Sequence, residues 1–67
     1  MTKYSLIING TFVDIELETY EDLMRKFSNM IHFKREITNT SDSYLYYNTN
    51  TFWYNDMEII LQKATLK

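Results

Sequence analysis

Three carboxylates that alternate along one short stretch, Asp14, Glu16 and Glu18, are the residues whose types and spacing could do chemistry. In an extended strand such residues share one face and lie about 7 Å apart. That spacing is too wide for all three to converge on one ion, so we expect no metal site here. The set predicts either an acidic stripe that meets a basic groove, or a solvated strand face on which Glu16 pairs with Lys3.

Catalytic groups are scarce. The chain has one imidazole, His32, and no Cys, so the other nucleophile candidates are Ser and Thr hydroxyls. The single glycine, Gly10, falls in a turn motif, which leaves no glycine-rich loop for a phosphate or an oxyanion. We therefore expect no catalytic site, no bound cofactor and no enzyme activity.

The cations gather in two pairs, Arg25-Lys26 and Lys34-Arg35, that could contact phosphate or an acidic partner. Solvation of a helix, with Glu21 paired to Arg25 at i, i+4, explains the first pair equally well. The aromatic stretch 44–57 contains no Lys or Arg, whereas a base-stacking surface combines rings with a basic groove. This separation, with a pI near 5.2, disfavours direct nucleic-acid binding.

The elements that must position these groups begin with a hairpin. Asn9-Gly10 between two β-rich runs predicts a two-residue type I′ turn, which pairs Ile7 with Phe12. One face of this hairpin should be core, and it carries Tyr4, Leu6, Ile8, Val13, Ile15 and Leu17. We expect the other face to be solvated, except for the Ile7–Phe12 pair.

An amphipathic helix should follow the hairpin. Apolar residues recur at helical spacing, and they are Tyr20, Leu23, Met24, Phe27 and Ile31. Thr19 and Asp22 resemble a capping box at the start of this segment. The pattern predicts one helix from near Thr19, followed by His32 close to its C-terminal end.

The remaining half of the chain predicts three strands. "FKREITN" and "YLYYN" form a hairpin around the turn "NTSDS", and "TNTFWYN" is expected to be a short turn or one helical turn. Residues 57–63 fit a strand better than a helix, because Ile-Ile-Leu is a short β-rich run. The expected architecture is α+β with the order ββαβββ: residues 1–67 form a single domain, with one helix packed on one face of a small antiparallel sheet.

Alternation divides the rings of the aromatic stretch between two faces. Leu45 and Tyr47 point one way and Tyr44 and Tyr46 the other, so one pair should be core and the other should face solvent or a partner. We expect Phe52 and Trp53 to cover the core. Tyr and Trp are also enriched in interface hot spots. Together with Ile7 and Phe12, these considerations predict partner-binding residues at Ile7, Phe12, Asp14, Glu16, Glu18, Tyr44, Tyr46, Tyr54 and Asp56.

The end of the chain, "YNDMEIILQKATLK", resembles the C-terminal ends of small prophage-encoded anti-CRISPR proteins that inhibit type II-A Cas9. The matching positions are Tyr54, Asn55, Asp56, Met57, Ile60, Lys63 and Leu66. Members of that family are more acidic and mimic DNA, whereas "NTNTFW" stands here where an acidic segment would be expected. The resemblance implies an inhibitor that occupies a surface of its target.

Three hypotheses of function result. The first is a phage or mobile-element protein that inhibits a host CRISPR effector, Cas9 foremost, by steric blocking. The second is a small nucleic-acid-binding accessory or regulatory protein, which requires Lys34, Arg35 and a Tyr pair on one face. The third is a homodimeric interaction module. No apolar run is long enough to span a bilayer, and the N-terminal segment does not read as a signal peptide, so we expect a cytoplasmic protein.

Overall fold

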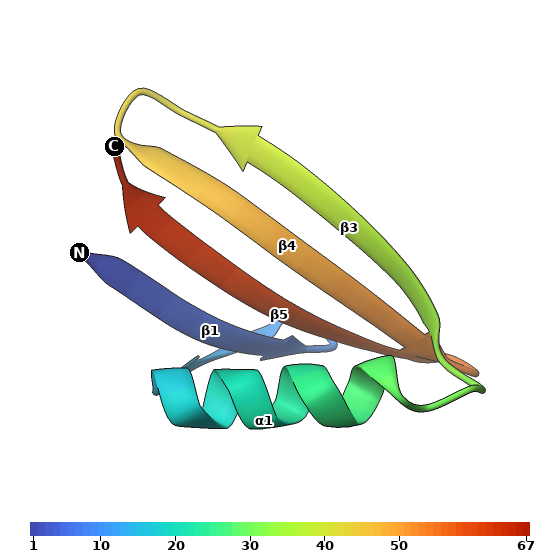
Figure 1. The fold of residues 1–67 in the computed structure, drawn as a ribbon. Helices are drawn as coiled ribbons and strands as arrows, with labels where there is room; N and C mark the ends of the chain where they lie inside the picture. The colour runs from blue at the N-terminus through green and yellow to red at the C-terminus, as the bar shows by residue number, and fades with distance from the viewer.

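The computed structural model describes residues 1–67 as one five-stranded sheet with one helix (Figure 1). In chain order the elements are β1 (Thr2–Ile8), β2 (Thr11–Ile15), α1 (Leu17–Ser28), β3 (Lys34–Ser41), β4 (Leu45–Tyr54) and β5 (Met57–Leu66). The strands lie in the order β2-β1-β5-β4-β3, and every neighbouring pair is antiparallel. The predicted α+β fold with ββαβββ order is confirmed.

The helix lies along one face of the sheet, below β1 and β5, while β3 and β4 curve away from its N-terminal half (Figure 1). We call the side that faces α1 the inner face and the opposite side the outer face. A single helix about 10 Å wide cannot cover a face of five strands, which is about 20 Å across. Part of the inner face and the whole outer face therefore lack a covering element.

The first hairpin has the predicted register, with Ile7 opposite Phe12 and Tyr4 opposite Ile15. Its turn uses the left-handed conformation at Asn9 (φ 47°) and at Gly10 (φ 84°). The predicted core face is only partly core: Tyr4 and Ile15 pack against the core cluster. Ile8 and Val13 of the same face are 40% and 49% exposed, because the helix covers only part of the sheet.

The helix begins two residues before the expected start. Its N-cap is Glu16, which makes no side-chain capping bond, and Thr19 already lies in the first turn, so the predicted capping box is wrong. Strand β2 ends at Ile15 and the chain enters the helix at once. Leu17, expected on the core face of the strand, is instead the first helical residue and is 48% exposed.

Four members of the predicted apolar stripe face the core: Tyr20 is buried, and Leu23, Met24 and Phe27 pack against the core cluster. The fifth does not, because the helix ends at Ser28 and Ile31 lies in the loop to β3 with 90% of its surface exposed. The helical ion pairs also differ from the expected Glu21–Arg25 pair. Asp22 is the acidic partner, 3.1 Å from Arg25 and 3.0 Å from Lys26.

The segment 49–55 was expected to be a turn or one helical turn. Residues 49–54 are instead the second part of strand β4, and only Asn55 lies in a turn. The alternating Thr and aromatic residues favour a strand. The asparagines do not make a turn, because their side-chain amides find partners within the sheet. Asn48 donates across to Asn39 on β3 (2.7 Å), and Asn50 donates along β4 to Asn48 (3.0 Å). Strand β5 extends to Leu66, past the predicted 57–63, because it pairs on both sides with β1 and β4.

The core is small and aromatic. Tyr20, Phe52 and Leu61 form its buried centre, between α1, β4 and β5. Around them pack partly buried residues, which are Tyr4, Leu6, Ile15, Leu23, Met24, Phe27 and Phe33. Several rings contact one another, with centroids 4.8 Å apart for Tyr4 and Tyr20 and 5.5 Å for Phe27 and Phe52.

Candidate functional site

The outer face of the sheet carries a set of apolar side chains, of which Phe12 and Leu66 are more than half exposed. Alternation and register direct one side chain in two from each strand to this face. Its apolar members are Ile7, Phe12, Leu45, Tyr47, Trp53, Ile60 and Leu66. We describe this outer apolar surface as the candidate site because no helix packs on it (Figure 1).

Ile7 is the centre of this surface. Its cross-strand partners are Phe12 on β2 and Ile60 on β5. Ile7 is only 5% exposed although no helix covers it, whereas Phe12 is 68% exposed. Both residues were expected to bind a partner on an otherwise solvated face. Phe12 is exposed enough to do so, whereas Ile7 is almost fully enclosed and offers a partner little surface.

Charged and polar groups lie beside and between the apolar side chains of the outer face. Lys3 and Asp14 form an ion pair across β1 and β2, at 3.6 Å, where the sequence had suggested Lys3 with Glu16. The bond from Gln62 Nε2 to Thr49 Oγ1 (3.2 Å) lies between the two apolar ends of the face. The outer apolar surface therefore consists of two apolar clusters with a polar pair between them, and protein-binding surfaces commonly combine apolar contacts with hydrogen-bonding groups.

The predicted partner-binding residues do not form one surface. Ile7, Phe12 and Asp14 share the outer face. Glu16 is the helix N-cap and Glu18 lies in the first helical turn, so the expected stripe of carboxylates along one strand does not exist. The stripe was wrong because the strand ends at Ile15.

The remaining predicted residues lie at the two ends of β4. Tyr44 is in the β3–β4 turn and Tyr46 is on the inner face, and both are exposed. Tyr54 lies at the other end, with its ring 5.4 Å from that of Phe33, and Asp56 is in the β4–β5 turn. Neither of the two predicted pairs, Leu45 with Tyr47 or Tyr44 with Tyr46, is buried in the core. Phe52 and Trp53 point to opposite faces, and only Phe52 is buried.

Sequence reasoning missed Trp53, Ile60 and Leu66 as members of the outer surface. The signal that could have found them is the alternation within 45–54 and 57–66, read as two full-length strands with the faces assigned from Phe52. The prediction of a turn over residues 49–55 concealed this alternation.

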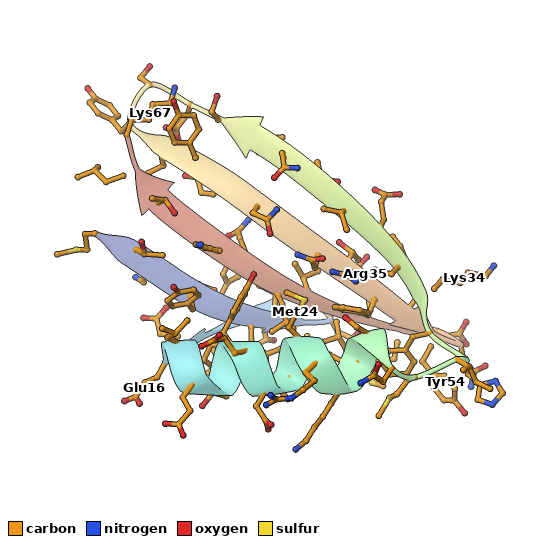
Figure 2. All side chains as sticks on the ribbon, viewed as in Figure 1. Glu16, Met24, Lys34, Arg35, Tyr54 and Lys67 are labelled. Atoms are coloured by element: carbon orange, nitrogen blue, oxygen red, sulfur yellow. The ribbon has the colours of Figure 1, made fainter.

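The second hypothesis required Lys34, Arg35 and a tyrosine pair on one face, and the structure does not bring them together. Lys34 and Arg35 are consecutive strand residues and point to opposite faces (Figure 2). The guanidinium of Arg35 lies between helix and sheet, 3.8 Å from the sulfur of Met24 and 5.5 Å from the centroid of the Phe52 ring.

The β3–β4 turn is fixed by one carboxylate. Asp42 Oδ1 accepts hydrogen bonds from the backbone amides of Tyr44 (2.8 Å) and Leu45 (2.7 Å), and Oδ2 accepts one from the Tyr47 hydroxyl (3.1 Å). These bonds, chiefly the one from Tyr44, hold the pKa of Asp42 below its usual value. The same bond to the carboxylate raises the pKa of Tyr47. The turn thereby orients Tyr47 on the outer face.

No group of three or more His, Cys, Asp or Glu side chains lies close enough to hold a metal ion. The single helix, α1, is too short and too polar to cross a membrane. Comparisons of the chain with protein-family models, curated proteins and solved structures found no match.

Proposed function

We propose that this protein is a phage or mobile-element protein that works without chemistry, by binding a host CRISPR effector nuclease in the bacterial cytoplasm. The effector that we name is Cas9, and the mechanism is stoichiometric steric blocking. The observation that supports the binding surface is the outer face of the sheet, where Phe12 of the edge strand β2 is exposed beside the enclosed Ile7 and near the Lys3–Asp14 ion pair. The observation that supports the target is the resemblance of residues 54–67 to type II-A inhibitors.

Six of the seven residues of that resemblance fall into two groups, and the seventh, Lys63, lies on the inner face. Tyr54 and Met57 end β4 and begin β5, and Asn55 and Asp56 form the two-residue turn between them. Asn55 has φ 55°, a conformation in which Asn is favoured. Ile60 and Leu66 lie on the outer apolar surface. Part of the motif therefore builds the central hairpin, and the other part lies on the surface that we propose for docking.

The test uses the purified chain with guide-loaded Cas9. Co-migration in size-exclusion chromatography and a fall in target cleavage that saturates near equimolar protein are expected. Phe12→Ser should weaken inhibition by about tenfold or more, because exposed aromatic anchors dominate interface energies. Ile31→Ser is the matched control, since Ile31 is equally apolar, more exposed and outside the outer face.

An excess of protein that neither co-migrates with Cas9 nor reduces cleavage would end this proposal. Equal loss of inhibition in the Phe12 and Ile31 variants would reject the outer face as the docking surface.

A homodimer is the second candidate function. An isologous contact would place two outer faces together and cover both copies of Phe12. Sedimentation equilibrium of the wild type and of Phe12→Ser distinguishes it: a wild-type dimer that Phe12→Ser dissociates is expected. A wild-type monomer at high concentration excludes it.

A further inference from the structure

The inner face holds a hollow that the proposed function does not use. It has a volume of about 410 Å³ and lies between the helix residue Tyr20 and the part of the sheet that the helix does not cover. Its floor is formed by neighbouring rows of side chains on β3, β4 and β5, including Asn39, Asn48, Lys63 and Thr65. The volume is within the range of small-molecule sites, about 300–1,000 Å³, and no carboxylate lines it.

A directional chain of hydrogen bonds leads into this hollow. Arg35 Nη2 and Nε donate to Asn50 Oδ1 at 2.7 and 3.0 Å, Asn50 donates to Asn48 Oδ1, and Asn48 donates to Asn39 Oδ1. A guanidinium has donors and no acceptor. Arg35 therefore fixes which end of each amide faces the next, and the direction of the chain follows from this chemistry.

The last amide of the chain supplies donors to the hollow. Because Asn39 Oδ1 already accepts from Asn48, the Nδ2 group of Asn39 remains as a donor, polarised by the charge of Arg35 behind it. Lys63 is the cross-strand partner of Asn48 and adds an ammonium group that takes part in none of the three ion pairs of the chain. These two donors lie in one row across the sheet, on either side of Asn48.

An aromatic ring lies beside these donors. Tyr46 lines the hollow and is 56% exposed, and Lys67 Nζ lies 5.0 Å from the centroid of its ring. The hydroxyl of Thr65, the cross-strand partner of Tyr46, can donate or accept. The hollow therefore combines positive donors for an anion with a flat apolar face and a neutral polar group.

The chain of hydrogen bonds from Arg35 to Asn39 places a polar side chain in the core, and this lowers the free energy of unfolding relative to an apolar residue there. Asn50 is 3% exposed within a core of few residues, where an apolar side chain would be cheaper. A fully bonded network of this kind rigidifies its surroundings. Its effect here is to hold Asn39 and Asn48 in fixed orientations at the floor of the hollow.

We propose that this hollow binds a nucleoside phosphate, with the phosphate at Lys63 and Asn39 and the base against the ring of Tyr46. The site lies on the opposite face from the outer apolar surface and shares only Lys63 with the residues of the C-terminal resemblance. A neutral sugar would make no use of the ammonium group, and inorganic phosphate alone would leave the ring without a role.

Isothermal titration of the full chain at low ionic strength tests the site with AMP, ATP, adenosine and inorganic phosphate. AMP and ATP are expected to bind with Kd values below about 1 mM. Adenosine and phosphate should each bind at least about tenfold more weakly than AMP, because each lacks one half of the recognised ligand.

Lys63→Gln should weaken AMP binding at least about tenfold. Lys34→Gln is the matched control, because it removes the same charge from the outer face. Asn39→Asp keeps the shape and places a carboxylate where the donor was, and it should abolish binding. Circular dichroism establishes that each variant is folded.

Three results would overturn the site: no nucleotide binding up to about 10 mM, adenosine as tight as AMP, or equal losses in the Lys63 and Lys34 variants. A single-stranded oligonucleotide that binds when mononucleotides do not would replace the site with a nucleic-acid surface. Because no Cas9 is present in this assay, its failure leaves the proposed inhibition untouched.

Discussion

At the scale of single residues, Arg35 has the widest influence. Its guanidinium joins β3 to β4 through Asn50 and contacts both Met24 of the helix and the ring of Phe52. Figure 2 shows Arg35 and Met24 pointing toward one another, while the neighbouring Lys34 points away from the molecule. Adjacent cations of the sequence thus have unrelated roles, because strand geometry sends them to opposite faces.

Arg35→Ala should lower the free energy of unfolding by about 1–3 kcal/mol, because it leaves the buried carbonyl oxygen of Asn50 without its donor. Urea denaturation followed by circular dichroism measures this loss. Lys34→Ala on the same strand should change stability by less than about 0.5 kcal/mol. An equal loss of unfolding free energy in the two variants would show that the Arg35–Asn50 bond does not stabilise the fold.

Asp42 should make stability depend on pH in acid. Its folded-state pKa is lowered by the amides of Tyr44 and Leu45, so the unfolded state binds protons more readily. The stabilisation is complete above the unfolded value of about 3.9 and is lost as pH falls through the lower folded pKa. The difference in stability between wild type and Asp42→Asn should therefore shrink as the pH falls below about 4, and urea denaturation at a series of acid pH values measures it.

Asp22 provides a comparison for this acid dependence. Its pKa is lowered chiefly by Lys26 and then by Arg25, so its contribution has the same sign. Because these are exposed ion pairs, 1 M salt should reduce the effect of Asp22→Asn more than that of Asp42→Asn. A salt response of the same size in both variants would argue against backbone bonds as the cause at Asp42.

At the scale of elements, the β1–β2 hairpin fixes the outer surface. Its turn sets the register that places Ile7 beside Phe12. The backbone amide of Asn9 also donates to the carbonyl of Glu58 (3.3 Å), which ties the turn to the central strand β5. A slip of one residue would exchange the two faces of the hairpin.

Gly10→Ala should destabilise the protein by about 1–2 kcal/mol. No atom lies within 4 Å of an added Cβ, so the cost comes from holding a non-glycine residue at φ 84°. Asn55→Gly is the matched change, because glycine reaches φ 55° without strain, and stability should stay within about 0.5 kcal/mol. Thermal denaturation compares the two, and an unchanged Gly10→Ala variant would contradict the strained turn.

At the scale of the whole molecule, stability depends on very few buried side chains. A domain of 67 residues has about 3–10 kcal/mol of stability. Phe52 and Leu61 are its fully buried large side chains, and the sheet receives its one covering helix on the face that they share. The loss of either should therefore remove a large share of the total.

Leu61→Ala should lower the free energy of unfolding by about 2–5 kcal/mol, so that a measurable fraction of the protein is unfolded without denaturant. Leu66→Ala lies on the same strand but is 55% exposed, and it should cost less than about 1 kcal/mol. Chemical denaturation of the two variants checks this contrast. A similar loss at both positions would mean that the core extends to the end of β5.

Local signals in the sequence determined most of the elements of this protein. Asn9-Gly10 fixed a hairpin and its register, apolar spacing from Tyr20 to Phe27 fixed the helix, and a β-rich run fixed the last strand. Each depends on backbone preferences or on periods that a few neighbouring residues define.

Only the tertiary structure decided which faces are covered and where the strands end. Strand β4 continues through Asn48 and Asn50 because Asn39 and Arg35, both on β3, bind their side-chain amides. No local signal in the sequence indicates a partner that is distant along the chain. The predicted carboxylate stripe is absent because β2 ends at Ile15 and the helix begins. Trp53 and Ile60 lie with Ile7 and Phe12 on the outer surface because β4 and β5 are longer than predicted. Periodicity assigns residues to faces, but only the position of the one helix determines which face is left open.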